Sequence, residues 1–334
     1  MPDADVVVVG AGIGGLSAAG LLAKSGLRVL VIDRNYMPGG ACGAIRRDGV
    51  TWDMGAAMLF GFGESGFSPH RFLMNELEEP VEVIRHRALY RLNYGDDPIV
   101  FWPEMDRFLD ELARVFPAER AELAAFYRSI GDLFENVIRA DPVYVSPSEM
   151  RASDLRGQFF SRPVKQLRTL ALLTSSAAKL IRRHVRSPRA VAFFDKLTST
   201  YCYTTMEETP AILAATMFVD NHAGGSYYPV GSPAVLAGRL ERAVEKRGGA
   251  FRYETEVTGI LFDDRGRVRG VRTADGEEIV AAQVVYAGAV HPLYRRLLPP
   301  EVVPARERAR IEGMVLTHPS MVLYGHVKAD AVPP

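Results

Sequence analysis

The sequence has few of the features that mark secreted, zinc-binding or membrane-spanning proteins. Its 334 residues include only two cysteines, Cys42 and Cys202, which form neither a C-x-x-C pair nor a zinc-ligand spacing. No stretch reaches the ~20 apolar residues of a transmembrane helix. The short apolar run Val6–Val9 follows acidic residues, unlike a secretory signal. We therefore expect a cytoplasmic protein that is soluble or rests peripherally on a membrane surface.

The charge balance and the histidines also exclude several kinds of partner. Lys plus Arg and Asp plus Glu each number 40, so the net charge gives no support for a nucleic-acid or acidic partner. None of the seven histidines stands four residues from another, and we expect no metal site. His222 and His291 are interpreted as structural residues, and Cys42 as a small packing residue.

Residues 4–33 predict a strand, a glycine-rich turn, a helix and a second strand. Val6–Val9 is a β-branched run of the kind that parallel sheets bury. Apolar residues then recur at helical spacing until Gly26, which is placed to cap the end of a helix. Arg28–Ile32 predicts the second strand.

The turn within this unit is a dinucleotide-binding fingerprint. Residues 10–15 read Gly-Ala-Gly-Ile-Gly-Gly and contain G-x-G-x-x-G at Gly10, Gly12 and Gly15. The first glycine permits a tight turn, the second lets the backbone approach a pyrophosphate, and the third allows close packing of helix and strand. The following helix presents free N–H groups to the phosphates. Asp33 ends the next strand, where a carboxylate can accept hydrogen bonds from ribose hydroxyls.

A second match to the same pattern lies at residues 61–66 but lacks its context. No clear strand precedes this match, and Ser68-Pro69 stands where the helix should already be running. We interpret residues 61–66 as a flexible loop.

Two further features favour FAD over NAD. Gly39-Gly40 follows Asp33 after a short link and allows a second close approach of the backbone. Trp52-Asp53-Met54-Gly55 then follows a turn at Asp48-Gly49. Each feature alone is typical of an ordinary turn, but together they point beyond a generic NAD domain.

The rest of the chain divides into helical and strand-rich parts. Apolar spacing predicts a helix over 104–140 and another over 233–247, the latter closed by Gly248-Gly249. Strands are predicted at 250–253, 257–263, 268–273, 277–280 and 283–286, with glycine-containing turns between them.

Residues 151–190 carry ten Lys or Arg and a single acid, Asp154, interleaved with Phe and Leu. One interpretation is a solvated basic face on ordinary helices. The other is a membrane-surface patch, in which the cations meet anionic headgroups while the apolar side chains dip below them.

Several motifs resemble the phytoene desaturase and carotenoid isomerase branch of FAD-dependent oxidoreductases. The resemblance rests on these segments: Asp33–Asn35, Pro38–Gly40, Arg47–Gly55, Met58–Gly63, Gly157–Pro163 and Gly224–Gly231. The last three are more similar to the carotene cis-trans isomerases than to the desaturases. The resemblance extends from residue 5 to about the end of the chain.

The resemblance implies roles for particular residues. Gly10, Gly12, Gly14 and Gly15 would face the pyrophosphate of FAD, and Asp33 would hold the adenosine ribose with Arg34 beside it. Gly39, Gly40, Met54 and Gly55 would run near the flavin. The backbone of Val257 would contact adenine, and Ala287 and Gly288 would close over the nucleotide. The resemblance identifies no catalytic residue.

The implied fold class is α/β: a Rossmann-like FAD-binding domain of the amine oxidase or phytoene desaturase type with an inserted α+β substrate domain. We assign residues 1–80 and 230–292 to the FAD-binding domain and 81–229 and 293–334 to the substrate domain.

The chain departs from the family in two ways. Ser232 stands where many members have a glycine, and members are longer than this chain. We expect a strand at 321–327 in the substrate-domain sheet, left as an open edge. The chain alone would then bind FAD weakly and form homo-oligomers or need a complementing C-terminal chain.

The expected function is FAD-dependent isomerisation, desaturation or saturation of C=C bonds in a long apolar polyene. The flavin would carry the chemistry, so the lack of a metal motif or a Ser-His-Asp arrangement is expected. One alternative is an amine oxidase-like enzyme that acts on a small polar substrate, against which the basic and apolar middle segment argues. The other is a split flavoprotein half without activity of its own.

Overall fold

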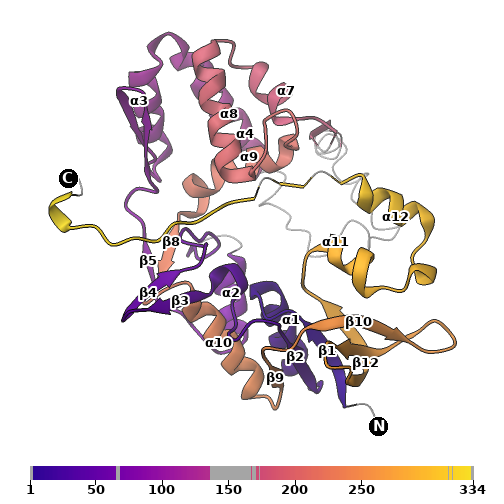
Figure 1. Cartoon of the computed structure of the whole chain (residues 1–334). Helices are drawn as coiled ribbons and strands as arrows, with labels where there is room; N and C mark the ends of the chain where they lie inside the picture. The colour runs from indigo at the N-terminus through magenta and orange to yellow at the C-terminus, as the bar shows by residue number, and fades with distance from the viewer. Residues whose placement is uncertain are drawn as a thin grey trace.

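The computed structural model describes residues 3–64, 68–135, 167, 171–172, 174–314, 316–317 and 319–331. A twisted six-stranded sheet with helices against it lies at one end of the molecule, and a bundle of helices lies at the other (Figure 1). The chain passes between these two parts through β5 (Val83–Arg85) and β8 (Tyr227–Pro229), which pair antiparallel.

The large sheet has the order β10-β11-β12-β1-β2-β9. Its strands are β1 (Ala4–Val9), β2 (Val29–Ile32), β9 (Ala250–Arg252), β10 (Val257–Phe262), β11 (Val268–Thr273) and β12 (Glu278–Tyr286). Strands β12, β1, β2 and β9 run parallel, whereas β10 and β11 form an antiparallel hairpin. The predicted strands at 277–280 and 283–286 are one strand, because the first half of β12 pairs with β11 and the second half with β1.

Two helices cover one face of this sheet. α1 (Ile13–Lys24) connects β1 to β2, and α10 (Ala234–Glu245) lies beside it. Leu16, Leu236 and Leu240 belong to the cluster that these helices bury against Val6 and Val8. Valines of β1 are buried on both faces, which explains why the strand is a continuous apolar run.

A cluster of ionic side chains joins α10 to α2 (Pro69–Glu76). Glu79 follows α2, and its side chain is only 1% exposed. Its carboxylate accepts hydrogen bonds from Nε of Arg242 (2.9 and 3.0 Å) and from Nζ of Lys246 (2.6 Å), and Arg239 lies at 3.4 Å. These cations hold the pKa of Glu79 at about 2, well below its ordinary 4.5.

The helical bundle is built around aromatic side chains. Its described helices are α3 (Met105–Val115), α4 (Arg120–Leu133), α7 (Ala177–Arg182), α8 (Pro188–Cys202) and α9 (Ala211–Gly224). The hairpin β6 (Arg91–Tyr94) and β7 (Asp97–Val100) packs against them. Phe193 is fully buried, and its ring lies 5.2–6.3 Å from the rings of Phe194, Phe116, Tyr94 and Phe101.

The region 104–140 that was predicted to be helical contains two helices rather than one continuous helix. The helix breaks at Phe116, which leaves the helical region of φ and ψ, and the 3₁₀ turn Pro117–Glu119 separates α3 from α4. Proline lacks an N–H and disfavours a helical conformation in the residue before it, so the apolar periodicity continued across a break in the backbone. Residues 136–140 lie outside the described part of the chain.

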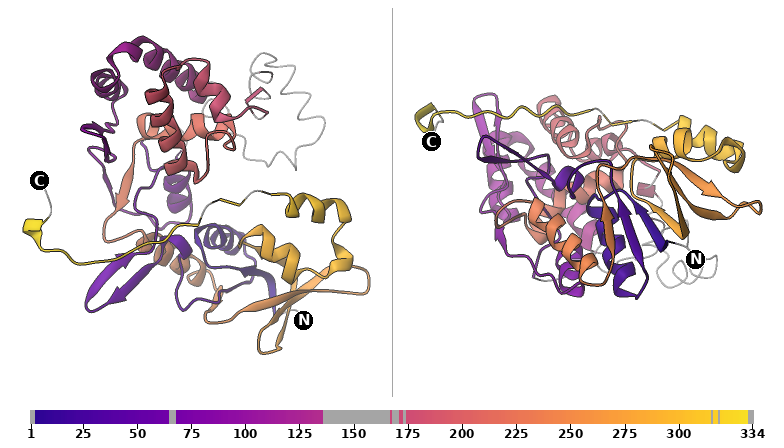
Figure 2. Two further views of the ribbon diagram at one scale, coloured as in Figure 1. Left: turned by 45° about the horizontal axis from the view of Figure 1, so that its top comes forward. Right: turned by 60° about the horizontal axis from the view of Figure 1, so that its bottom comes forward.

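The predicted strand at 321–327 was also wrong. Residues 319–328 are extended but belong to no strand, and they run from the side of α12 (Ala305–Glu312) toward the hairpin β3 (Ala44–Arg47) and β4 (Val50–Asp53) (Figure 2). Met321 and Leu323 are each 84% exposed. Alternation predicts a strand only where a second strand lies alongside, and none pairs with this segment among the described residues.

Residues 290–312 lie against the large sheet rather than the helical bundle. They form α11 (Val290–Pro292), a π-helical turn η4 (Leu293–Leu297), a 3₁₀ turn η5 (Pro300–Val302) and α12. The largest apolar cluster draws its buried residues from 89–219, and the two clusters around the sheet draw theirs from 4–77 and 227–281. The domain boundaries at 80, 230 and 292 remain a prediction.

Candidate functional site

The glycine-rich turn after β1 is held by main-chain contacts at the carboxyl ends of three parallel strands. The N–H of Gly10 donates to the carbonyl of Ile32, and the N–H of Ala287 donates to that of Val9, each at 2.8 Å. Gly10 has a φ of +110°, which favours glycine. A Cβ on Gly15 would lie 1.9 Å from the carbonyl oxygen of Gly10, so α1 can approach β1 only through a glycine.

Gly12 and Gly14 differ from Gly15 because they face open space. A Cβ built on either residue would meet no atom within 4 Å. Gly12 is the N-cap of α1, and within the described ranges no side-chain cap hydrogen bond is made at this helix start. Unpaired N–H groups and the positive end of the helix dipole favour an anion at this position. The turn therefore fits a pyrophosphate, and side chains at 12 and 14 would fill its place.

Asp33 stands at the end of β2 and braces the same turn. Its Oδ2 accepts a hydrogen bond from the N–H of Ala11 (2.6 Å), and its Oδ1 accepts one from the N–H of Asn35 (2.8 Å). A carboxylate has about four acceptor positions, so capacity remains for ribose hydroxyls. Arg34 is exposed and lies near Tyr286 at the end of β12. Burial raises the pKa of Tyr286, and the positive charge of Arg34 partly offsets this increase.

Gly39 and Gly40 lie directly against the fingerprint. The N–H of Gly39 donates to the carbonyl of Ala11 (2.8 Å), and Gly39 forms a parallel bridge with Gly12. The two glycines have φ values of +116° and +56°, and a Cβ on Gly40 would lie 3.3 Å from Cα of Gly12. This Gly-Gly pair therefore allows two loops to approach each other at the candidate phosphate site.

The hairpin β3–β4 ends beside this loop. Met54 follows β4, its N–H donates to the carbonyl of Gly43, and the N–H of Ala56 donates to that of Ala41. Met54 and Gly55 are exposed and line the same side as Gly39–Gly43. Their predicted place near the flavin is consistent with this arrangement.

Asp53 belongs to the Trp52–Gly55 motif, but the sequence assigned no role to its side chain. Its Oδ2 accepts a hydrogen bond from the hydroxyl of Tyr228 (2.6 Å), and its Oδ1 accepts one from that of Ser232 (2.8 Å). Burial, together with this carboxylate, raises the pKa of Tyr228 to about 12. Asp53 therefore ties the end of β4 to the segment that leads into α10. The sequence signals were its place in that motif and at the end of a half-buried strand.

The remaining predicted residues converge on the same edge. The N–H of Thr255 donates to the carbonyl of Asp33 (3.0 Å), and Val257, two residues later, is buried in one cluster with Ile32. A Cβ on Gly10 would lie 3.5 Å from the carbonyl group of Ala287, and Gly288 follows at the end of β12. The fingerprint glycines, Asp33, Gly39, Gly40 and Ala287 thus lie around the carboxyl ends of β1, β2 and β12. The contacts of all thirteen predicted residues with a cofactor remain predictions.

The remaining sequence predictions concern the second glycine motif, the histidines, metal or membrane features and the basic stretch. No strand precedes the second glycine motif at 61–66, whose Phe62 is buried; Ser65 and Gly66 lie outside the described residues. His222 is half-buried and bonded through Nδ1 to the carbonyl of Pro103, in keeping with a structural role. Within the described ranges there is no cluster of metal ligands and no helix long and apolar enough to cross a membrane. The motif at 157–163 and about half of the basic stretch 151–190 lie outside those ranges.

Comparisons with known proteins agree with this geometry. The family model of flavin containing amine oxidoreductases matches residues 13–325. Prolycopene isomerase 2 of an Oncidium hybrid is 31% identical over 99% of this chain and 56% of its own length. The zeta-carotene-forming phytoene desaturase of Myxococcus xanthus is 29% identical over 92% of this chain and 57% of its own length. The chain therefore spans about half the length of these curated relatives.

The structures point to the same fold. An oxidoreductase of Methanosarcina mazei superimposes with a TM-score of 0.64 at 20% identity, covering 92% of this chain and 64% of the other. The predicted fold class, α/β with a Rossmann-like nucleotide-binding part, is confirmed. The family model covers most of the chain, and the glycine-lined edge has the geometry that the fingerprint requires. The chain thus belongs to the flavin containing amine oxidoreductase family.

Proposed function

We propose that this chain binds FAD at the glycine-lined edge and takes part in the conversion of C=C bonds in a long apolar polyene. The observation that carries the cofactor is the open space at Gly12 and Gly14, set against the uncapped start of α1. The resemblance of its motifs to carotenoid isomerases and desaturases, together with the relatives named above, supports the polyene.

Within this proposal, the residues of the chain bind and orient the cofactor. The first turn of α1 holds the pyrophosphate, Asp33 accepts hydrogen bonds from the adenosine ribose, and Gly39–Gly40 allows close approach on the flavin side. Asp53 fixes the end of β4, and with it Met54 and Gly55, through Tyr228 and Ser232. Bound FAD supplies hydride transfer at the flavin ring.

The cofactor site is tested by Gly12→Val. The backbone at Gly12 has φ −70° and ψ 169°, which valine adopts readily, so the fold should keep its thermal stability. The side chain occupies the pyrophosphate position and should weaken FAD binding by at least about 1–3 kcal/mol. Flavin-to-protein ratio and fluorescence titration measure this. Undiminished flavin in a folded variant overturns the site, and Gly12→Ala provides a smaller second obstruction.

Gly15→Ala is the matched comparison. Its Cβ would collide with the carbonyl of Gly10 and not with the ligand. We expect loss of thermal stability even without flavin, in contrast to Gly12→Val. Equal melting temperatures for the two variants would show that the two glycines do not have the separate roles assigned to them.

The polyene is tested with the purified protein, FAD and cis and trans carotenoids, with products separated by chromatography. An isomerisation leaves the oxidation level of the substrate unchanged, whereas a desaturation requires an electron acceptor. The assay is therefore run with oxidised and with reduced FAD, each with and without an added quinone. Turnover of small polar amines but of no carotenoid would favour the alternative amine oxidase-like function.

We also propose peripheral association with membranes through the basic stretch 151–190. Of its described cations, Arg182 pairs with Glu207 and Arg189 with Asp97, each at 2.8 Å, so part of the charge is neutralised within the molecule. Co-sedimentation with liposomes should require anionic lipid and decline with added salt. Equally weak binding to neutral and anionic vesicles at low salt would leave only a solvated basic face.

A further inference from the structure

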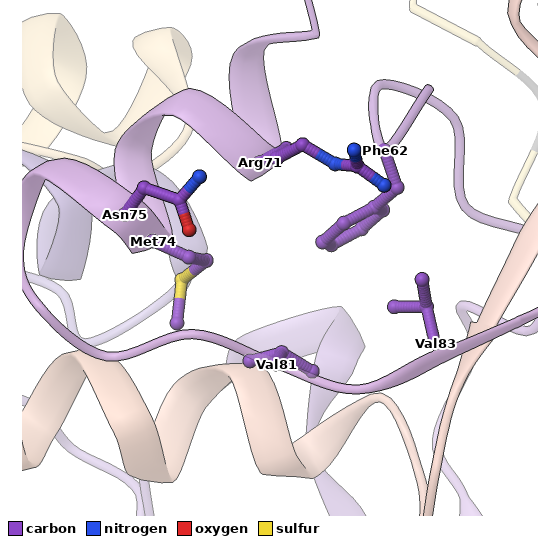
Figure 3. Close-up of a pocket in the computed structure, with 6 residues that line it drawn as sticks. All are labelled: Phe62, Arg71, Met74, Asn75, Val81 and Val83. Carbon is purple, nitrogen blue, oxygen red and sulfur yellow. The ribbon is translucent and has the colours of Figure 1, made fainter. Parts of the chain in front are cut away.

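Two adjoining cavities lie away from the glycine-lined edge, between α2, β5 and the end of α9. Their volumes are 260 and 440 Å³, and both are lined by Arg71 and Val83. Figure 3 shows the smaller one, with Arg71 and Asn75 projecting from α2 on one side and Val81 and Val83 on the other. The larger volume alone falls within the range of about 300–1,000 Å³ for small-molecule sites.

The two cavities differ in chemical character. The smaller is lined mainly by apolar side chains: Phe62, Met74, Val81 and Val83. Phe62 and Met74 belong to the buried cluster around the large sheet, so this wall is fixed by the fold. The larger adds a second guanidinium, that of Arg85, beside Gly224 and Tyr227. The two cavities thus adjoin at Arg71 and Val83, and the larger is lined by two guanidinium groups.

Neither arginine side chain has a partner in the described part of the chain. Across the described residues, no ion pair and no side-chain hydrogen bond involves Arg71 or Arg85. By contrast, Arg242 is bound to buried Glu79. Glu64 lines the same cavity but is exposed and pairs with neither arginine. Arg85 is exposed, whereas Arg71 is half-buried, and no described residue compensates the partial removal of its guanidinium, which stays charged, from water.

The backbone near Arg85 also allows an unusually close approach. Gly225 has a φ of +79°, and a Cβ at this position would lie 2.9 Å from Nε of Arg85 and 3.4 Å from the hydroxyl of Tyr227. The glycine thus lets the guanidinium lie against the end of α9 at the wall of the larger cavity. Planar guanidinium groups bind carboxylates through two parallel hydrogen bonds.

We propose that these cavities form a binding site for an amphiphilic monocarboxylate, such as a medium-chain fatty acid. The carboxylate lies between Arg71 and Arg85, and the hydrocarbon chain lies against Phe62, Met74 and Val83. None of the residues assigned to the cofactor lines either cavity. The site therefore does not depend on the proposed flavin chemistry, and either can fail without the other.

The test is calorimetric titration of the full chain with decanoate, below its micelle concentration, against decanol and acetate. Decanoate should bind at one site per chain, and both comparison ligands should bind at least roughly tenfold more weakly, since each lacks one of the two interactions. Equal binding of decanol would show a plain apolar crevice, and equal binding of acetate a simple anion site. Many sites per chain would show detergent-like adsorption. Each of these results overturns the proposal.

Variants assign the site to its residues. Arg71→Gln should lower the affinity for decanoate at least roughly tenfold, the worth of a charge-assisted hydrogen bond. Arg87→Gln is the matched control, because Arg87 is exposed nearby and lines neither cavity. Unchanged affinity in Arg71→Gln, or an equal loss in both variants, contradicts the proposal. Arg85→Gln gives a second reading if Arg71→Gln melts at a lower temperature than the parent chain.

Discussion

The glycine-lined edge and the aromatic helical bundle are built in opposite ways. The edge is shaped by residues without side chains, such as Gly15 and Gly40, and by main-chain hydrogen bonds between loops. The bundle is filled by large rings such as Phe193 and Phe126, which are fully buried. Backbone geometry at the edge permits few substitutes, whereas a packed core accepts many apolar residues of similar volume. The sequence of the edge therefore predicts the kind of ligand that it binds, whereas the sequence of the bundle does not.

Among the variants that test this contrast, Phe193→Ala should have the largest effect on the free energy of unfolding. Removal of a fully buried ring with four aromatic neighbours should lower the free energy of unfolding by about 3–5 kcal/mol. The affinity of the folded protein for FAD should stay the same. Chemical denaturation and flavin titration measure the two quantities separately.

Leu213→Ala on the neighbouring α9 is the control, because its side chain is exposed and it should cost less than about 0.5 kcal/mol. If Phe193→Ala lowered FAD affinity as strongly as stability, the bundle and the edge would act as one unit and the contrast between them would be lost.

Glu79→Gln comes next and tests whether a buried ion cluster supports the edge. The pKa of Glu79 falls from its ordinary 4.5 to about 2 in the folded chain, so the unfolded chain binds the proton more tightly. The stabilisation is thus complete above pH 4.5 and is lost as the pH falls toward 2. Because its cationic partners are about half exposed, we expect a loss of about 2–3 kcal/mol at pH 7.

The stability of Glu79→Gln should also depend less on pH between about 4.5 and 2 than that of the parent chain. Its neighbour Glu78 is 81% exposed, and Glu78→Gln should change neither quantity. A parent chain whose stability is flat across this pH range would show that Glu79 is not held by its cations as described.

Asp33→Ala reverses the pattern expected for the bundle. It should weaken FAD binding by about 1.5–3 kcal/mol, the worth of hydrogen bonds to a charged group, and lower stability less than Phe193→Ala does. Asp5→Ala is the control, since Asp5 is a carboxylate of β1 that pairs with Arg28 outside the candidate site. Unchanged flavin affinity in Asp33→Ala would remove this residue from the ribose site.

Ser232→Gly is expected to have the smallest effect. The hydroxyl of Ser232 donates to Asp53 and accepts from the N–H of Ala234 (3.0 Å). Loss of these two bonds should cost about 1 kcal/mol or less, because Ser232 has a φ of +157°, a conformation that glycine adopts without strain. Thermal denaturation measures it. A loss as large as that of Glu79→Gln would make the Asp53 network a main support of the edge.

Much of the sheet could be predicted, because its signals are local. Val6–Val9, the glycine turn and Asp33 lie within one β-α-β unit, and the structure brings them together as the spacing indicates. The break at Phe116 was missed because the apolar residues of α3 and α4 keep the same helical spacing across Pro117. That spacing gives no sign that the helix is interrupted. The segment 321–327 was misread because pairing depends on a partner strand, which no property of the segment itself reveals.

The site shows the same division. The role of the glycines can be predicted from their spacing in the sequence. The hydrogen-bond partners of Asp53 cannot, because they lie about 175 positions away in the chain. Arg71 and Arg85 meet at a cavity only because β5 pairs with β8, and that contact brings in the end of α9. Contacts of this range are set by the assembled fold and leave no periodic trace in the chain.

The position of β1 in the sheet also governs how the chain must fold as it is made. One neighbour of β1, β2, follows within thirty residues, but the other is β12, and the bond between Asp3 and Val280 spans 277 residues. At ribosomal rates this separation corresponds to a delay on the order of tens of seconds. Throughout that delay the valine-rich β1 has one edge open to pairing with other chains. The strand that begins the nucleotide site therefore also needs protection during synthesis.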